Sequence, residues 1–144
     1  SLYLGRARPG ISQRPIRDLV DAGVDTPWIV APRLLHAVGV AIPTHLVPHM
    51  LGWVAGSPAC LYPIDRAISH WCEHNDIHVG YTWPSLVNHA DEPSTVPNMT
   101  RAASAPHPVL ARRVAWRVGG RDQWTSECTA LVLPNRDEVG DRVG

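Results

Sequence analysis

The fold is decided by the stretch from Ile64 to Asp91, which reads IDRAISHWCEHNDIHVGYTWPSLVNHAD. Its first part has apolar residues that recur with helical spacing and would lie on one face. These residues are Ile64, Ile68, Trp71 and Cys72. They predict a helix from about Pro63 to Asn75 with that face in the core. Residues His78 to Trp83 alternate as a strand does, and Pro84 ends that strand.

The rest of the chain alternates between strand-like and helix-like segments. The predicted strands cover 1–5, 28–31 and 36–44, and the predicted helices cover about 15–22 and 44–53. Thr44 is the expected cap of the second of these helices, and Gly39 marks a strand position where a backbone or ligand comes close. Two further strand-like segments lie at 114–118 and 129–133. This order predicts an α/β layer arrangement, with 1–98 as the main unit and 99–144 as an irregular tail containing short strands.

Length and charge limit the classes of protein to consider. A chain of 144 residues is enough for one domain with a core. The formal net charge is zero, so no overall field attracts nucleic acid or a membrane surface. No apolar run approaches the length that spans a bilayer, and no signal peptide is recognisable. All basic residues are Arg, which can bind phosphate in a bidentate manner.

The cysteines and the first residue give two further expectations. The three cysteines are widely spaced and form no C-x-x-C pair, which predicts reduced thiols in a cytoplasmic protein. The chain starts at Ser1 without a Met and enters a strand-like segment at once. This start suggests a fragment or a truncated domain.

Asp65 is the first candidate for chemistry. A carboxylate in the first turn of a helix commonly only complements the helix dipole. It can also act as a general base at the mouth of an α/β crevice if an attacking hydroxyl comes within hydrogen-bond reach. Spacing alone does not choose between these interpretations.

His89, at the end of the predicted strand and turn, is the second candidate. A single histidine usually makes one hydrogen bond in a loop or core, but it can also ligate a divalent metal or contact a diphosphate oxygen, with Asn88 or Asp91 beside it. His70 and His74 are four residues apart on one helix, so a metal hydrolase using them with His89 is a further alternative. A zinc-protease helix is excluded because Glu73 precedes the second histidine instead of following the first.

Several familiar motifs are absent from the sequence. It has no G-x-G-x-x-G, no G-x-x-x-x-G-K and no G-x-S-x-G, so dinucleotide sites, P-loops and nucleophile elbows are excluded. Ser85 has no flanking glycine and would make a poor nucleophile. Tyr81 and Trp83 have flat aromatic faces that can stack on a sugar ring, although most of the six tryptophans must belong to the core.

Four segments together resemble the acceptor-side half of A-type (Rossmann-like) glycosyltransferases, particularly a bacterial and phage-associated set. These segments are Ser1–Gly5 followed by Arg8-Pro9, His36–Pro43, Tyr62–Arg66 and Tyr81–His89. The most specific part is P-S-L-V-N-H, which is similar to the signature that closes the catalytic domain of that family. The resemblance covers about residues 1–95.

The resemblance implies transfer of a sugar from a nucleotide-sugar to a hydroxyl acceptor, with inversion. Asp65 would be the base, and His89 would contact a metal-bound diphosphate, the metal being Mn²⁺ or Mg²⁺. The substrate crevice would be lined by Gly39, Tyr81, Trp83 and Ser85. The D-x-D motif that holds the metal in that family is missing, so we expect the nucleotide-binding half to lie elsewhere. The alternative is a non-catalytic binding or structural module that keeps the fold.

Overall fold

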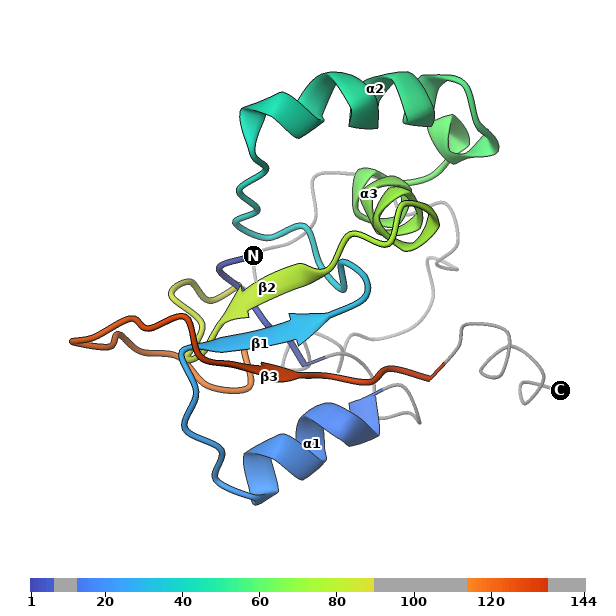
Figure 1. The fold of residues 1–144 in the computed structure, drawn as a ribbon. Helices are drawn as coiled ribbons and strands as arrows, with labels where there is room; N and C mark the ends of the chain where they lie inside the picture. The colour runs from blue at the N-terminus through green and yellow to red at the C-terminus, as the bar shows by residue number, and fades with distance from the viewer. Residues whose placement is uncertain (7–12, 90–113, 135–144) are drawn as a thin grey trace, which may run out of the picture.

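The computed structural model describes residues 1–6, 13–89 and 114–134 and shows a mixed α/β fold (Figure 1). Its helices and strands are α1 (Arg14–Asp21), β1 (Trp28–Ala31), α2 (Val47–Ala55), α3 (Ile64–His74), β2 (Val79–Thr82) and β3 (Cys128–Ala130). Two 3₁₀ turns, η2 (Thr44–Leu46) and η3 (Pro58–Leu61), flank α2. The α/β class is thus as predicted. The helices α1, α2 and α3 lie close to the three helices that the sequence predicted.

The three strands form one mixed sheet in the order β2-β1-β3. β1 and β2 are antiparallel, with Trp28 opposite Thr82 and Ala31 opposite Val79. β1 and β3 are parallel. Figure 1 shows α1 on one side of the sheet, with α3 and then α2 stacked on the other.

Two apolar clusters hold these layers together. The first joins α1 to the sheet and contains Leu4, Ile16, Ile29, Ala31, Tyr81, Trp83, Leu131 and Leu133. The second joins α2, α3 and the loop after β1, and contains Leu34, Met50, Ile68, Trp71 and Cys72. The helical spacing of the α3 residues explains the second cluster, since three of its members share one face of that helix.

The N-terminal residues run through the middle of the molecule as an extended segment. The Leu2 amide donates to Gly39 O, and the amides of Thr82, Leu86 and Trp116 donate to Ser1 O, Leu2 O and Leu4 O. Within the described residues this segment forms only one isolated bridge, Gly5 with Ala115, so the strand predicted at 1–5 is extended but does not join the sheet.

The strand predicted at 36–44 is wrong, because the described residues there form bends and no ladder. Gly39 has a φ of +62°, a left-handed conformation that interrupts an extended chain. The apolar residues of this segment, including Val40 and Ile42, pack onto the second cluster instead of a neighbouring strand. Thr44 is also not a cap, since it is the first residue of η2.

The part of the chain beyond residue 113 contributes to the same sheet and core. Leu131 and Leu133 belong to the first cluster, and the Leu131 amide donates to Val30 O. The predicted strand at 129–133 corresponds to the shorter β3, and 114–118 forms isolated bridges with Gly5 and Ser85. No helix among the described residues is long and apolar enough to cross a bilayer. The three cysteines are free, and only Cys72 is buried.

Candidate functional site

Two histidines from distant parts of the chain flank Tyr3. The Tyr3 ring centroid lies 5.7 Å from that of His36 and 6.4 Å from that of His89. Tyr3 itself is 1% exposed. We call these three residues the Tyr3 cluster. It brings together one residue from each of three segments that carry the family resemblance.

Tyr3 is held in place by its neighbours in the N-terminal segment. The Leu4 amide donates to Ser85 Oγ over 2.9 Å, which fixes the backbone beside Tyr3. A Cβ at Gly5 would overlap the Tyr3 phenol, so the ring folds back over the glycine. Glycine is therefore required at this position for the ring to lie where it does.

His89 contributes a buried nitrogen to the cluster. Its Nδ1 is inaccessible to solvent and makes no hydrogen bond to any part of the chain that the structure describes. Its backbone amide donates to Asn88 Oδ1, which also accepts from the Ala115 amide and so ties this turn to the later chain. An unsatisfied buried polar atom costs about 1–3 kcal/mol, so a ligand that pairs with Nδ1 would gain from the contact.

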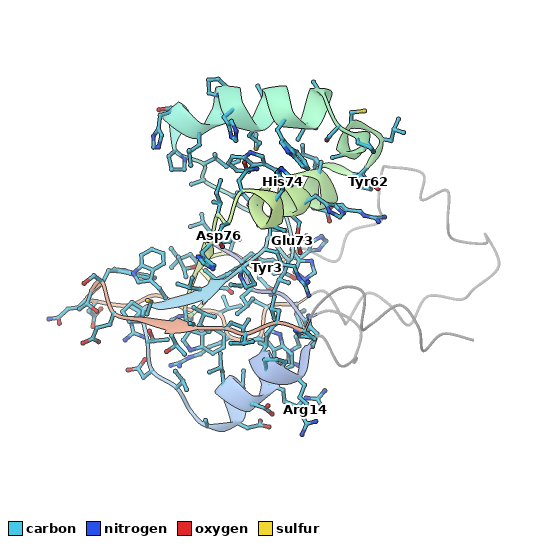
Figure 2. All side chains as sticks on the ribbon, turned by 45° about the vertical axis from the view of Figure 1, so that its right-hand side comes forward. Tyr3, Arg14, Tyr62, Glu73, His74 and Asp76 are labelled. Carbon is cyan, nitrogen blue, oxygen red and sulfur yellow. The ribbon has the colours of Figure 1, made fainter. Side chains whose placement is uncertain are left out.

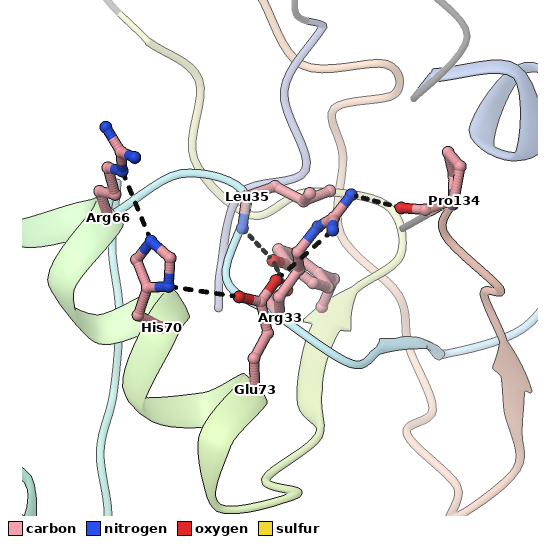
Figure 3. Close-up of polar contacts among 7 residues, drawn as sticks. Arg33, Leu35, Arg66, His70, Glu73 and Pro134 are labelled. Atoms are coloured by element: carbon pink, nitrogen blue, oxygen red, sulfur yellow. Dashed lines mark hydrogen bonds and ion pairs between the residues drawn. The ribbon is translucent and has the colours of Figure 1, made fainter. Parts of the chain in front are cut away.

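A chain of polar contacts runs from α3 to Pro134 (Figure 3). Arg66 Nε donates to His70 Nε2 over 3.5 Å, and His70 Nδ1 lies 3.7 Å from Glu73 Oε2. Glu73 Oε1 pairs with Arg33 Nη1 at 3.4 Å, and Arg33 Nη2 donates to Pro134 O. Figure 2 shows Glu73 projecting from α3 toward the side of the molecule that holds Tyr3.

Tyr81 and Trp83 were predicted to stack on a sugar, but the structure places both in the first apolar cluster. Tyr81 is 0% exposed and Trp83 is 2% exposed. The Tyr81 hydroxyl donates to Arg33 O and accepts from the Leu35 amide, and burial raises the pKa of this phenol. Trp83 Nε1 donates to Val24 O. Neither ring has a face open to a ligand, so their predicted role does not fit the structure.

Ser85 and Gly39 also have structural roles. Ser85 is fully buried, and its Oγ accepts the hydrogen bond from the Leu4 amide described above. A Cβ at Gly39 would lie 3.2 Å from Leu2 Cβ and 3.3 Å from a Val87 methyl. The close approach predicted at Gly39 therefore exists, and it is made by the protein's own Leu2 and Val87.

Asp65 lies in the first turn of α3, as predicted. It is half-buried, and its Oδ1 accepts from the Arg66 amide over 2.8 Å. Within the described residues, no hydrogen bond or ion pair links Asp65 to His89. The arrangement agrees with the dipole interpretation and leaves the carboxylate accessible to a proton donor.

The histidines proposed for a metal hydrolase face different ways. His74 packs on Trp53 of α2, with ring centroids 5.4 Å apart, whereas His70 contacts Glu73 and the Tyr62 ring. In the described ranges no three His, Cys, Asp or Glu side chains are grouped closely enough to hold a metal ion. Asp91 lies outside the described residues. The residues described do not by themselves make the expected Mn²⁺ or Mg²⁺ site.

Sequence reasoning missed Tyr3, His36, Arg33 and Glu73 as residues of a site. The spacing of Arg66, His70 and Glu73, at four and three residues, does predict one charged face on α3. Arg33 follows the predicted strand at 28–31 and Pro32, so its position at a strand end could be predicted from the sequence. Nothing local pointed to Tyr3 and His36, which meet only through tertiary contacts.

Comparisons of this chain with protein-family models, with curated proteins and with solved structures give no match.

Proposed function

We propose that the chain is the acceptor-side part of an A-type glycosyltransferase, which transfers a sugar from a nucleotide-sugar to a hydroxyl. The proposal starts from the sequence resemblance. Its structural support is the Tyr3 cluster, where segments 1–5, 36–43 and 81–89 meet although they are far apart in sequence. The observation that carries it is the buried Nδ1 of His89, which has no hydrogen-bond partner among the described residues.

In the proposed reaction the acceptor oxygen attacks the anomeric carbon of the donor. A new C–O bond forms there, and the bond to the nucleoside diphosphate breaks on the opposite face, so the configuration inverts. Asp65 accepts the proton of the acceptor hydroxyl. Once the groups that cover it move aside, an Nδ1–H of His89 would donate a hydrogen bond to the departing diphosphate, which takes the electron pair of the broken bond. Any divalent metal would need ligands beyond the described residues.

Asp65→Asn tests the base. In the full reading frame that contains this chain, we expect the variant to fold normally and to lose about 10²–10⁴-fold in sugar transfer, because the amide cannot accept the proton. Asp18→Asn, an exposed carboxylate on α1, is the matched control and should keep full activity. Full transfer by Asp65→Asn would remove Asp65 from the mechanism.

His89→Ala tests the diphosphate contact separately. We expect weaker binding of nucleoside diphosphates, measured by calorimetry across a panel of bases, while His45→Ala on the exposed η2 turn leaves binding unchanged. Unchanged binding by His89→Ala would place the diphosphate elsewhere.

The second candidate is a non-catalytic module with the same fold. It is favoured by the finding that Tyr81, Trp83 and Ser85 serve the core rather than a ligand. A well-folded protein from the full reading frame that binds no nucleoside diphosphate would support this candidate over the transferase.

A further inference from the structure

An exposed tryptophan projects from a loop at one end of the sheet. Trp124 is 39% exposed. The other tryptophans that the structure describes are buried or half-buried. It belongs to the loop between Gly119 and Cys128, which extends beyond the strands in Figure 1. The loop sequence RDQWTSE, residues 121–127, is polar apart from this one ring.

Trp124 is paired with a second indole. Its ring centroid lies 5.2 Å from that of Trp28, with an angle of 52° between the planes. Trp28 is half-buried over Gly80 of the neighbouring strand, where a Cβ would lie 3.9 Å from the ring. One ring is therefore anchored on the sheet, and the other extends the aromatic surface into solvent.

The loop is held at both ends, so the rings are already in position before any ligand arrives. Trp28 Nε1 donates to Thr125 O over 2.9 Å, and Thr26 Oγ1 donates to Glu127 O. On the other side, Arg121 Nη1 pairs with Asp25 Oδ1 at 2.5 Å and lies within hydrogen-bond reach of Thr26 O. Pre-organisation of this kind reduces the entropy cost of binding.

Asp25 adds a polar group that is tied to the same loop through Arg121. Its side chain is 69% exposed, and Arg121 pairs with Oδ1. The hydrogen bond and charge of Arg121 lower the pKa of the Asp25 carboxyl, so it stays ionised at neutral pH. Its Oδ2 remains able to accept hydrogen bonds from hydroxyl groups.

We propose that Trp28 and Trp124 form a binding surface for the pyranose ring of a saccharide, with Asp25, which Arg121 ties to the same loop, as its hydrogen-bonding group. A pyranose has an apolar face of C–H groups that matches a flat indole, and an equatorial rim of hydroxyls that matches a carboxylate. A protein partner would need a much larger apolar patch than one ring in a polar loop provides. The surface does not depend on the transferase activity proposed above.

The test is a titration of the 144-residue chain with methyl β-D-glucopyranoside and methyl β-D-galactopyranoside, followed by NMR of the tryptophan indole N–H signals. We expect saturable shifts of the Trp28 and Trp124 signals, while the buried Trp71 and Trp83 signals stay in place. Trp124→Ala should weaken binding by about tenfold, the loss expected for one aromatic contact. Trp124→Tyr, which keeps an aromatic face, should retain most of the affinity, and Leu61→Ala should leave it unchanged.

Three results would overturn the proposal. The first is the absence of saturable shifts at Trp28 and Trp124 with either pyranoside. The second is an equal response to sorbitol, which has the hydroxyls without the ring, or to uridine, which would make this a site for nucleobases. The third is unchanged affinity in both a folded Trp124→Ala and Asp25→Asn. A failure of sugar transfer would leave these binding results unaffected, so the two proposals fail separately.

Discussion

At the scale of the residue, the Tyr81 hydroxyl joins β2 to the loop after β1 by two hydrogen bonds, to Arg33 O and from the Leu35 amide. Tyr81→Phe removes both and leaves two backbone groups without a partner at a fully buried position. We expect the free energy of unfolding to fall by about 1–3 kcal/mol. Urea denaturation measures this as a lower midpoint with an unchanged slope.

Tyr62→Phe is the matched control, because the Tyr62 ring is half-exposed and contacts His70 and Arg66 through its face. We expect a change within about 0.5 kcal/mol for it. Equal midpoints for the two variants would show that the Tyr81 hydroxyl bonds contribute nothing to stability.

The same residues show what a sequence can predict at this scale. The place of Asp65 in the first helical turn was predictable, because it depends only on neighbours along the chain. The burial of Tyr81 and Trp83 was not, because an aromatic residue at a strand end suits both a core and a sugar site. The pairing of Tyr3 with His36 and His89 depends on contacts between distant segments, for which the local pattern has no signal.

At the scale of the element, α3 is connected to the loop after β1 through Glu73. Arg33 is 8% exposed, so the Glu73 carboxylate at 3.4 Å offsets part of the cost of burying its guanidinium. Glu73→Gln removes the one carboxylate that pairs with this guanidinium among the described residues. We expect a loss of about 1–2 kcal/mol in the free energy of unfolding, less than for a fully buried pair because Glu73 is partly exposed to solvent.

Asp65→Asn on the same helix is the control for that stability measurement. Its carboxylate interacts with its own helix terminus and should contribute only a few tenths of a kcal/mol. A loss of equal size in the two variants would mean that the Arg33 pair adds nothing beyond a general effect of charge on α3.

The helices were the elements that the sequence predicted best. The recurrence of apolar residues at three and four positions is a strong local signal, and the bounds of α1 and α3 follow it closely, although Ile64, predicted to face the core, is 63% exposed. The false strand at 36–44 has the composition of a strand, but Gly39 turns the backbone into the left-handed region there. Small and β-branched residues pack equally well in a loop that covers a helix pair, so composition alone could not separate the two.

At the scale of the whole molecule, the α/β class followed from the order of the elements, but the connections between distant segments did not. Residues 99–144 were predicted as an irregular tail with short strands at 114–118 and 129–133, yet β3 pairs with β1 in the central sheet and Leu131 enters the core. A strand as short as the three residues of β3 can be recognised as strand-like, but it carries too little pattern to show which strand it pairs with. The position of β3 in the sheet is decided by β1, whose edge opposite β2 has backbone groups free to pair with it.

The N-terminal segment is bonded to β2 and to the chain near Trp116, so we predict that it unfolds together with the sheet. Leu4 is 0% exposed in the first apolar cluster, and its carbonyl accepts from the Trp116 amide. Leu4→Ala should lower the free energy of unfolding by about 2–5 kcal/mol, whereas Leu61→Ala, at an 84% exposed site, should have little effect. Because the segment contacts both β2 and the chain around residue 116, we expect this loss to spread through the molecule.

Native-state hydrogen exchange distinguishes a shared loss from a local one. If the N-terminal segment and the sheet open together, Leu4→Ala lowers the protection of the Trp116 and Thr82 amides and of the β1 amides by the same free energy. If the segment opens by itself, the Trp116 and Thr82 amides lose protection while β1 keeps it, and the cooperative prediction is wrong. The first result would mean that the Tyr3 cluster forms only when the whole sheet is folded, since Tyr3 and Leu4 are adjacent on that segment.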